Sequence, residues 1–283
     1  MAGAVVAALP DGRLHLQEGP IELVIGLDGT RAAMAEAARR AADAFEGLLA
    51  GLAVELPLLR TPIGVDPPAL RGRVAQRMAT AVWPFRRDFI TPMAAVAGAV
   101  AEEVLEAIAA IPGLLAAHVN NGGDIALFLA PGQVLRVGLV PSLERAAPEG
   151  LVRLTAADPV RGIATSGWPG RSFSRGIADA VTVLAATAAQ ADAAATVIAN
   201  AVDATHPAVR RVPADSLDPD SDLGALPVTV AVGPLPSEVI EAALDAGEAV
   251  AETLLQRGLI QGALLVVQDT IRAVGDPRLL PGC

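Results

Sequence analysis

The chain has 283 residues and a formal net charge of −10, and all 21 of its basic residues are arginine. Aromatic side chains make up 2% of the sequence, so the chain lacks the basic tracks and stacking surfaces by which proteins bind nucleic acid. The absence of lysine also excludes a Schiff-base lysine and the phosphate-binding lysine of a Walker motif.

The hydrophobic residues, 53% of the chain, do not predict a membrane-spanning segment. Most are Ala and Val, and acidic residues such as Glu102 and Asp192 interrupt the long apolar runs, whereas a spanning helix needs roughly 18 to 20 uncharged apolar residues. The N-terminus lacks the basic flank of a secretory signal, and the only cysteine, Cys283, excludes an intramolecular disulfide. We therefore expect a soluble, cytoplasmic protein with no membrane partner.

Hydrophobic periodicity predicts the elements in chain order. A strand pair, 13–16 and 21–25, is expected first, followed by helices over 31–52, 69–81 and 92–111. Period-two patterns with glycine breaks then predict strands over 117–120, 125–129, 134–140, 151–155, 162–165 and 180–184. The remaining expected elements are helices over 188–202 and 237–257 and strands over 228–232 and 263–267.

The order of these elements predicts the fold class. Hairpins with helical returns, rather than a regular strand-helix alternation, favour an α+β fold of antiparallel or mixed sheets with packed helices. We expect a single domain over 1–283. The segment 205–227, rich in Pro and Asp, is expected to be an excursion over the surface, and the pair Glu102 and Glu103 is expected to be solvated charge.

The first candidate site is a glycine turn between two predicted strands, formed by Asn121, Gly122, Gly123 and Asp124. Paired glycines allow the backbone to approach a ligand closely. A tight hairpin turn is an equally good explanation of the same residues. His118 nearby could carry a proton, although a structural role is commoner for a lone histidine at a strand end.

The second candidate site is the segment from Thr165 through Ser166 and Gly167 to Arg171, which follows a predicted strand. Hydroxyls, free backbone N–H groups and a guanidinium suit a phosphate or a carboxylate. An ordinary glycine-rich loop with an exposed arginine explains the pattern as well. Trp168 in this segment could stack on a planar ligand, although packing is the commoner use of tryptophan.

The third candidate site is the pair Asp192 and Thr196 on a predicted helix. Residues four apart share a helix face, so this carboxylate and this hydroxyl can offer two oxygens to a hard cation such as Mg²⁺. The competing explanation is a solvated helix face, which is the commoner use of such a pair.

Taken in this order, the three segments resemble the ApbE family of FAD:protein FMN transferases. The family's Gly-Gly-Asp turn matches residues 122–124, its Ala-Thr-Ser-Gly matches 164–167, its Val-Thr-Val strand matches 181–183 and its Ala-Asp-x-x-x-Thr matches 191–196. The resemblance implies an α+β fold that binds FAD or FMN near the glycine turn, with Mg²⁺ held by Asp192 and Thr196. Such a metal would polarise the pyrophosphate of FAD.

Two departures separate the chain from the transferases. The stretch 93–98 keeps the glycine of the family's Lys-Gly pair but lacks the lysine, and the connection 168–180 lacks the family's His-x-x-Asp-Pro-x-x-Gly segment. The chain therefore resembles more closely an uncharacterised ApbE-related family of bacteria and archaea. The sequence assigns no catalytic residue.

Three functional hypotheses follow. The first is Mg²⁺-dependent binding or transfer of a flavin nucleotide or another phosphate-bearing ligand. The second is an enzyme of the same fold that acts on a small anionic heterocyclic metabolite without flavin. The third is a non-catalytic homo-oligomeric module whose Ala-rich helices, beginning at Arg31 and Ser237, pack against partner subunits.

Overall fold

A computed structural model describes residues 4–139 and 150–275, in which the chain divides into two compact units. The first unit comprises Met1–Leu135, Leu154–Ala164 and Ala186–Asp192, and the second comprises Arg136–Arg153, Thr165–Ala185 and Ala193–Cys283. Cys283 and the last residue of the strand expected over 134–140 lie outside the described residues. The single domain expected over 1–283 stays a prediction.

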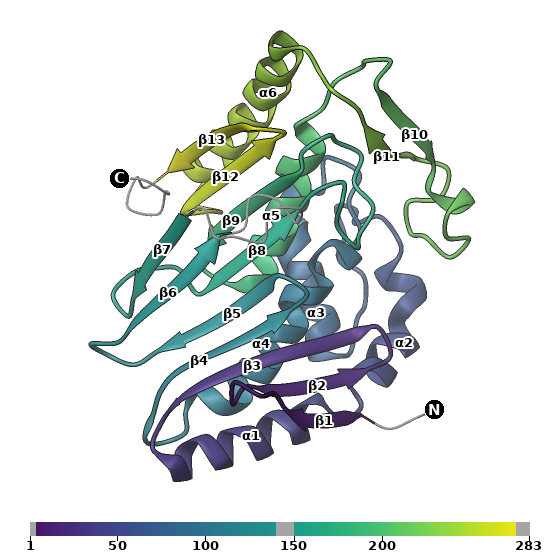
Figure 1. The fold of residues 1–283 in the computed structure, drawn as a ribbon. Coiled ribbons are helices and arrows are strands. Elements are labelled where there is room, and N and C mark those ends of the chain that lie inside the picture. The colour runs from purple at the N-terminus through teal and green to yellow at the C-terminus, as the bar shows by residue number, and fades with distance from the viewer. Residues whose placement is uncertain (1–3, 140–149, 276–283) are drawn as a thin grey trace. The chain divides into compact units, whose positions relative to one another are not determined.

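The first unit is built on an antiparallel sheet (Figure 1). Its strands, in sheet order, are β1 (Val5–Ala8), β2 (Leu14–Glu18), β3 (Ile21–Gly29), β4 (Leu114–Asn121), β5 (Asp124–Leu129) and the part of β8 (Gly162–Ser166) up to Ala164. The register pairs Leu23 with Asn121 and Asn121 with Asp124, so that β4 and β5 form a tight hairpin. Along β4 the residues Ala117, Val119 and Asn121 are buried and alternate with more exposed ones, which is the pattern of a sheet covered on one face.

Helices cover one face of this sheet (Figure 1). α1 (Arg31–Phe45) and α4 (Val96–Ala109) pack on the strands, α3 (Arg73–Val82) packs on α4, and α2 (Leu48–Leu59) packs on α3. The unit also contains 3₁₀ turns at Trp83–Phe85 and Pro92–Ala95 and the first residues of α5 (Ala188–Ala201). α1 begins at Thr30, whose hydroxyl accepts a hydrogen bond from the N–H of Ala33. α4 packs on β4 and β5 through a stripe of fully buried residues that includes Val100, Val104 and Ile108.

The single helix expected over 31–52 is wrong. α1 ends at Phe45, and Gly47, with φ of +78°, begins α2, which runs to Leu59 and contains Pro57. Glycine adopts this left-handed conformation without steric strain and commonly ends a helix. α2 is apolar on all sides and exposes Val54 and Leu58, so hydrophobic periodicity could not separate it from α1.

The second unit holds three neighbouring strands with a helix beside them (Figure 1). Its strands are β9 (Ala180–Ala185), β12 (Gly262–Val267) and β13 (Thr270–Gly275), each antiparallel to its neighbour, and α6 (Ser237–Gln256) packs on β12 and β13. β6 (Val134–Leu139) pairs with β7 (Gly150–Thr155) as a separate ladder. Neither β1 nor β13 was expected from the sequence.

The segment 205–227, expected to be an excursion over the surface, contains a strand that the sequence did not predict. β10 (Val209–Pro213) pairs antiparallel with β11 (Pro227–Val232), and a 3₁₀ turn at Ala214–Ser216 follows β10. Arg210 and Arg211 interrupt the apolar alternation of β10, which explains why period-two analysis missed it.

The α+β class with antiparallel sheets and packed helices is confirmed. Over the described residues, no helix is both long enough and apolar enough to cross a membrane.

Candidate functional site

The glycine turn is a two-residue hairpin loop between β4 and β5. Gly122 and Gly123 have φ of +66° and +114°, and the N–H of Gly123 donates to Oδ1 of Asn120 over 2.8 Å. Two successive positive φ angles are the geometry of the tight turns that glycine favours in hairpins. The hairpin explanation of these glycines is confirmed, and their contact with a ligand stays a prediction.

The residues that flank the turn lie on the face of the sheet that the helices cover. Asn121 is 8% exposed, and its Nδ2 donates to the carbonyl of Ala97 over 3.1 Å. Because side chains alternate along a strand and Asn121 is paired with Asp124, both side chains point to this face. The turn therefore presents an amide and a carboxyl to the first turn of α4.

Asp192 provides the N-terminal cap of α4 from a different helix. Its Oδ2 accepts a hydrogen bond from the N–H of Gly98 over 3.0 Å, and the N–H of Ala97 also bonds to this carboxyl. Ala95, the residue before α4, has no polar side chain and cannot cap the helix itself. The first N–H groups of a helix need an acceptor, and Asp192 supplies it.

Two carboxyl groups crowd this helix end. Burial raises the pKa of the Asp192 carboxyl well above its ordinary value, and the nearby Asp124 carboxylate raises this pKa further. The N–H groups of Gly98 and Ala97 act in the opposite direction, because they favour the ionised form. The structure thus brings together Asn121, Asp124 and Asp192, which the sequence placed in two separate candidate sites.

The helices α4 and α5 cap each other. Oε1 of Glu102 on α4 accepts from the N–H of Ala189 on α5 over 2.8 Å, and the Thr187 hydroxyl accepts from the N–H of Gln190. A Cβ on Gly98 would lie 2.3 Å from the carbonyl oxygen of Ala188, so the two backbones touch at a point where only glycine fits. This crossing fixes the position of Asp192 relative to α4.

Thr196 follows Asp192 by one helical turn, and both side chains are half-buried. The described residues contain no group of three or more His, Cys, Asp or Glu side chains that could hold a metal ion. A cation at Asp192 would therefore draw most of its ligands from neutral oxygens, water or a bound phosphate.

The segment that begins at Thr165 lies in the second unit and is anchored at its start. The Thr165 hydroxyl lies 2.9 Å from that of Thr182 on β9, and a Cβ on Gly167 would lie 2.3 Å from the carbonyl oxygen of Asp179. Nε1 of Trp168 donates to Oδ1 of Asp179 over 2.9 Å. The packing role of Trp168 is the one that the structure supports.

Beyond Trp168 the loop is open to solvent. The residues from Pro169 to Phe173, including Arg171, are all exposed, whereas Ser166 is half-buried. Arg171 therefore presents its side chain where a ligand could reach it. Its contact with a phosphate stays a prediction.

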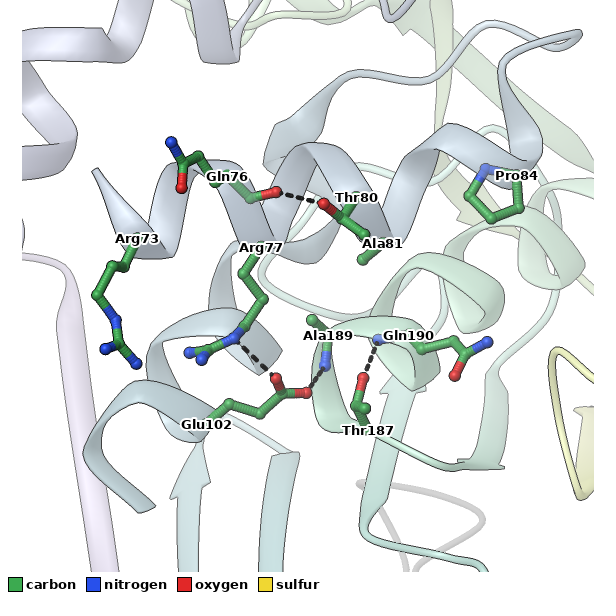
Figure 2. Close-up of a pocket in the computed structure, with 10 residues that line it drawn as sticks. All are labelled: Arg73, Gln76, Arg77, Thr80, Ala81, Pro84, Glu102, Thr187, Ala189 and Gln190. Carbon is green, nitrogen blue, oxygen red and sulfur yellow. Dashed lines mark hydrogen bonds and ion pairs between the residues drawn. The ribbon is translucent and has the colours of Figure 1, made fainter. Parts of the chain in front are cut away.

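Sequence analysis missed a pocket in the first unit (Figure 2). It has a volume of about 570 Å³ and lies between α3, α4 and the start of α5. Its lining residues are Arg73, Gln76, Arg77, Thr80, Ala81, Pro84, Glu102, Thr187, Ala189 and Gln190. The spacing of the polar residues on α3, at intervals of three and four, was the available signal.

The charges in this pocket are paired with one another. Arg77 contacts Glu102, Glu103 and Glu106 at 3.0, 3.0 and 2.7 Å. The side chains of Glu102 and Glu103 are 13% and 18% exposed, so the expectation that they are solvated charge is wrong. Because Arg77 is already bound by three carboxylates, the pocket does not favour an anionic ligand.

Replacing Asp192 by asparagine tests the crowding of the two carboxyls. Asp192→Asn keeps an oxygen that can accept from Gly98 but removes the charge beside Asp124, so we expect its melting temperature at pH 7 to rise by roughly 2 °C or more. Folding raises the pKa of Asp192 above its value in the unfolded chain, which is near 3.8. The stability of the wild type should therefore fall as the pH rises from 3.8 through the pKa that Asp192 has in the folded chain. Asp192→Asn should lack this slope.

Thermal melts across pH 3.5 to 8 measure both effects, since that window begins just below the unfolded pKa of Asp192, near 3.8. The exposed Glu252→Gln, which removes the same charge from α6, is the matched control. A lower melting temperature for Asp192→Asn at pH 7, with Glu252→Gln unchanged, would show that the cap requires the full negative charge.

A sequence model of the family described as AbpE bacteria matches residues 6–274. The chain therefore belongs to this family. The resemblance drawn from the glycine turn, the Thr-Ser-Gly segment and the Asp-x-x-x-Thr helix is confirmed at the level of the family.

Curated relatives are similar over part of their length. A UPF0280 protein of Methanopyrus kandleri is 42% identical over 135 residues, which cover 47% of this chain and 51% of the relative. A UPF0280 protein of Methanothrix thermoacetophila is 36% identical over 171 residues, which cover 58% and 64%. The chain thus spans about half to two thirds of the length of these relatives.

Among solved structures, the flavinyl transferase ApbE of Pseudomonas stutzeri in its apo form is 13% identical, with a TM-score of 0.45 over 98% of this chain and 96% of that one. The ApbE protein of Thermotoga maritima is 13% identical, with a TM-score of 0.46 over 95% and 96%.

Proposed function

We propose that this chain binds a flavin nucleotide, or a related phosphate-bearing ligand, together with Mg²⁺ held by Asp192 and Thr196. The observation that carries the proposal is that Asp192 and Asn121 both bind the first turn of α4, with Asp124 paired to Asn121 across the hairpin. Two carboxyls in this position repel each other when both are ionised, and a divalent cation relieves that repulsion.

The donor set fits magnesium. Oδ2 of Asp192 accepts from the N–H of Gly98, and this bond holds the carboxyl at the first turn of α4, where it would serve as a cation ligand. Thr196 adds a hydroxyl from the same face of α5. Mg²⁺ in proteins is commonly held by one or two carboxylates with waters and substrate phosphates, and this chain offers such a partial set.

Bound Mg²⁺ would polarise the phosphate oxygens of its ligand. Within the second unit, the exposed Arg171 and the half-buried Ser166 offer a guanidinium and a hydroxyl that suit a phosphate. Gly122 and Gly123, whose turn carries no side chains, would allow the ligand to approach the backbone. Binding is the activity that these residues support, since the stretch 93–98 carries no lysine to neutralise a phosphate.

The metal-binding pair can be tested by fluorescence titration of FAD in the presence of Mg²⁺. We expect Asp192→Asn to weaken Mg²⁺-dependent FAD binding by about tenfold or more, because losing one ligand of a partial set removes more than about 1.4 kcal/mol. Thr196→Val should weaken it less, since a neutral hydroxyl is lost.

Glu252→Gln serves as the matched control, because it removes an equal charge from the exposed face of α6. Its affinity should match that of the wild type. Equal affinities for wild type and Asp192→Asn would exclude Asp192 as a metal ligand.

A further inference from the structure

The loop that carries Thr165 to Arg171 is held at its far end by residues from two other elements. Its continuation, from Ser174 to Ile177, lies against the end of α5 and against the β10–β11 hairpin. All of these residues belong to the second unit. The hairpin therefore makes specific contacts with the loop, which the sequence did not predict for 205–227.

The contact with α5 is made by Asn200. Its Oδ1 accepts from the N–H of Arg175 over 2.9 Å, and the Ser174 hydroxyl lies 3.5 Å from the same oxygen. The N–H of Ile177 donates to the carbonyl of Val202. A Cβ on Gly176 would lie 2.0 Å from the carbonyl oxygen of Ala199, so the loop backbone rests directly on the helix.

The contact with the hairpin is made by Arg211 and Thr229. Nε of Arg211 donates to the carbonyl of Arg175 over 3.2 Å and approaches the Thr229 hydroxyl at 3.3 Å. The N–H of Thr229 donates to the carbonyl of Ser174 over 2.8 Å. Nη2 of Arg211 also pairs with Asp203, which orients the guanidinium.

A register shift in the hairpin places Arg211 for this role. Arg210 is paired with Ala231, whereas Arg211 is paired with Thr229, so Val230 is an extra residue on β11. Bulges of this kind re-aim a side chain. Arg211 is consequently 22% exposed and bonded to the loop, while its neighbour Arg210 is exposed.

From these contacts we infer that Arg211, Thr229 and Asn200 are positioning residues that set the conformation of the ligand loop from Thr165 to Phe173. Trp168 fixes the start of the loop through Asp179, and the three positioning residues fix its continuation at Ser174 and Arg175. Only the tip from Pro169 to Phe173 is left open to solvent. The role in ligand binding rests on the function proposed above, whereas the positioning of the loop does not.

The test is hydrogen-deuterium exchange of the full chain without ligand, followed by FAD titration with Mg²⁺. Arg211→Ala removes the bond to the Arg175 carbonyl, and we expect amides of 168–177 to exchange about tenfold faster while those of β12 are unchanged. FAD affinity should fall at least threefold. Arg210→Ala, one residue away on the same strand, should change neither quantity.

Isosteric variants guard against a general loss of stability. Asn200→Leu should loosen the same loop, whereas Asn200→Asp, which keeps an acceptor for the N–H of Arg175, should restore protection. Exchange in 168–177 that stays at the wild-type rate in Arg211→Ala, or that rises equally in β12, would overturn the positioning role. A wild-type chain that binds no FAD would refute the proposed function, and the exchange rates would still decide the positioning role.

Discussion

Gly98→Ala is expected to destabilise the chain by about 3 kcal/mol or more, because overpacking against backbone that cannot yield is costly. The new Cβ would lie 2.3 Å from the carbonyl oxygen of Ala188 and 2.7 Å from the nitrogen of Ala189, so α4 and α5 must separate. Separation would also break the bond from Gly98 to Asp192 and the bond from Ala189 to Glu102. The melting temperature should fall by roughly 6–12 °C, as seen by calorimetry or circular dichroism.

Gly51→Ala is the matched control, since it makes the same change inside another helix. A Cβ at Gly51 meets no atom of the described residues within 4 Å. Inside a helix, alanine is more favourable than glycine by about 0.5–1 kcal/mol, so this variant should be slightly more stable than the wild type. Equal effects of the two variants would contradict the close crossing of α4 and α5.

Arg77→Met is expected to destabilise the chain by about 2–3 kcal/mol, because it removes the cation that Glu102 binds in a largely desolvated position and leaves Glu103 and Glu106 with Arg73 alone. The Arg77 side chain is 17% exposed and binds Glu102, Glu103 and Glu106. Urea unfolding measures the loss. The expected loss of unfolding free energy is smaller than for a fully buried ion pair, because Glu106 is 51% exposed and water screens its charge.

Two further variants show whether charge repulsion is the cause. Arg77→Met combined with Glu102→Gln should recover part of the lost stability, since one of the uncompensated charges is removed while an acceptor for the N–H of Ala189 is kept. Arg39→Ala, which removes the exposed pairs with Glu36 and Asp43, should cause little measurable loss. A double variant no more stable than Arg77→Met would contradict the repulsion between the glutamates.

Local patterns predicted the parts of the fold that depend on neighbours in sequence. The β4–β5 hairpin follows from two glycines between period-two segments, and α5 follows from an Ala-rich run that carries Asp192 and Thr196 at helical spacing. The split between α1 and α2 was missed because α2 is apolar nearly all round, so the apolar positions of α1 continue past Gly47 without a visible break. β10 was missed because two arginines interrupt it.

Contacts between distant residues explain what the sequence could not predict about the candidate site. The bond from Gly98 to Asp192 joins residues 94 apart, and it exists only because α4 and α5 cross at a glycine. Glutamate is a residue type that is usually solvated, yet Glu102 caps α5 and binds Arg77. Whether a carboxylate is solvated, paired or used as a cap depends on tertiary structure that charge patterns alone do not encode.

Titration calorimetry of FAD into the wild-type chain, with excess Mg²⁺ and then with EDTA, tests the proposed function most directly. We expect saturable binding of one FAD per chain with Mg²⁺, and affinity at least about tenfold lower in EDTA, because the crowded carboxyls of Asp192 and Asp124 would then face the phosphates without a cation. The same affinity in both conditions, or no binding in either, would contradict a Mg²⁺-dependent flavin-nucleotide site at Asp192.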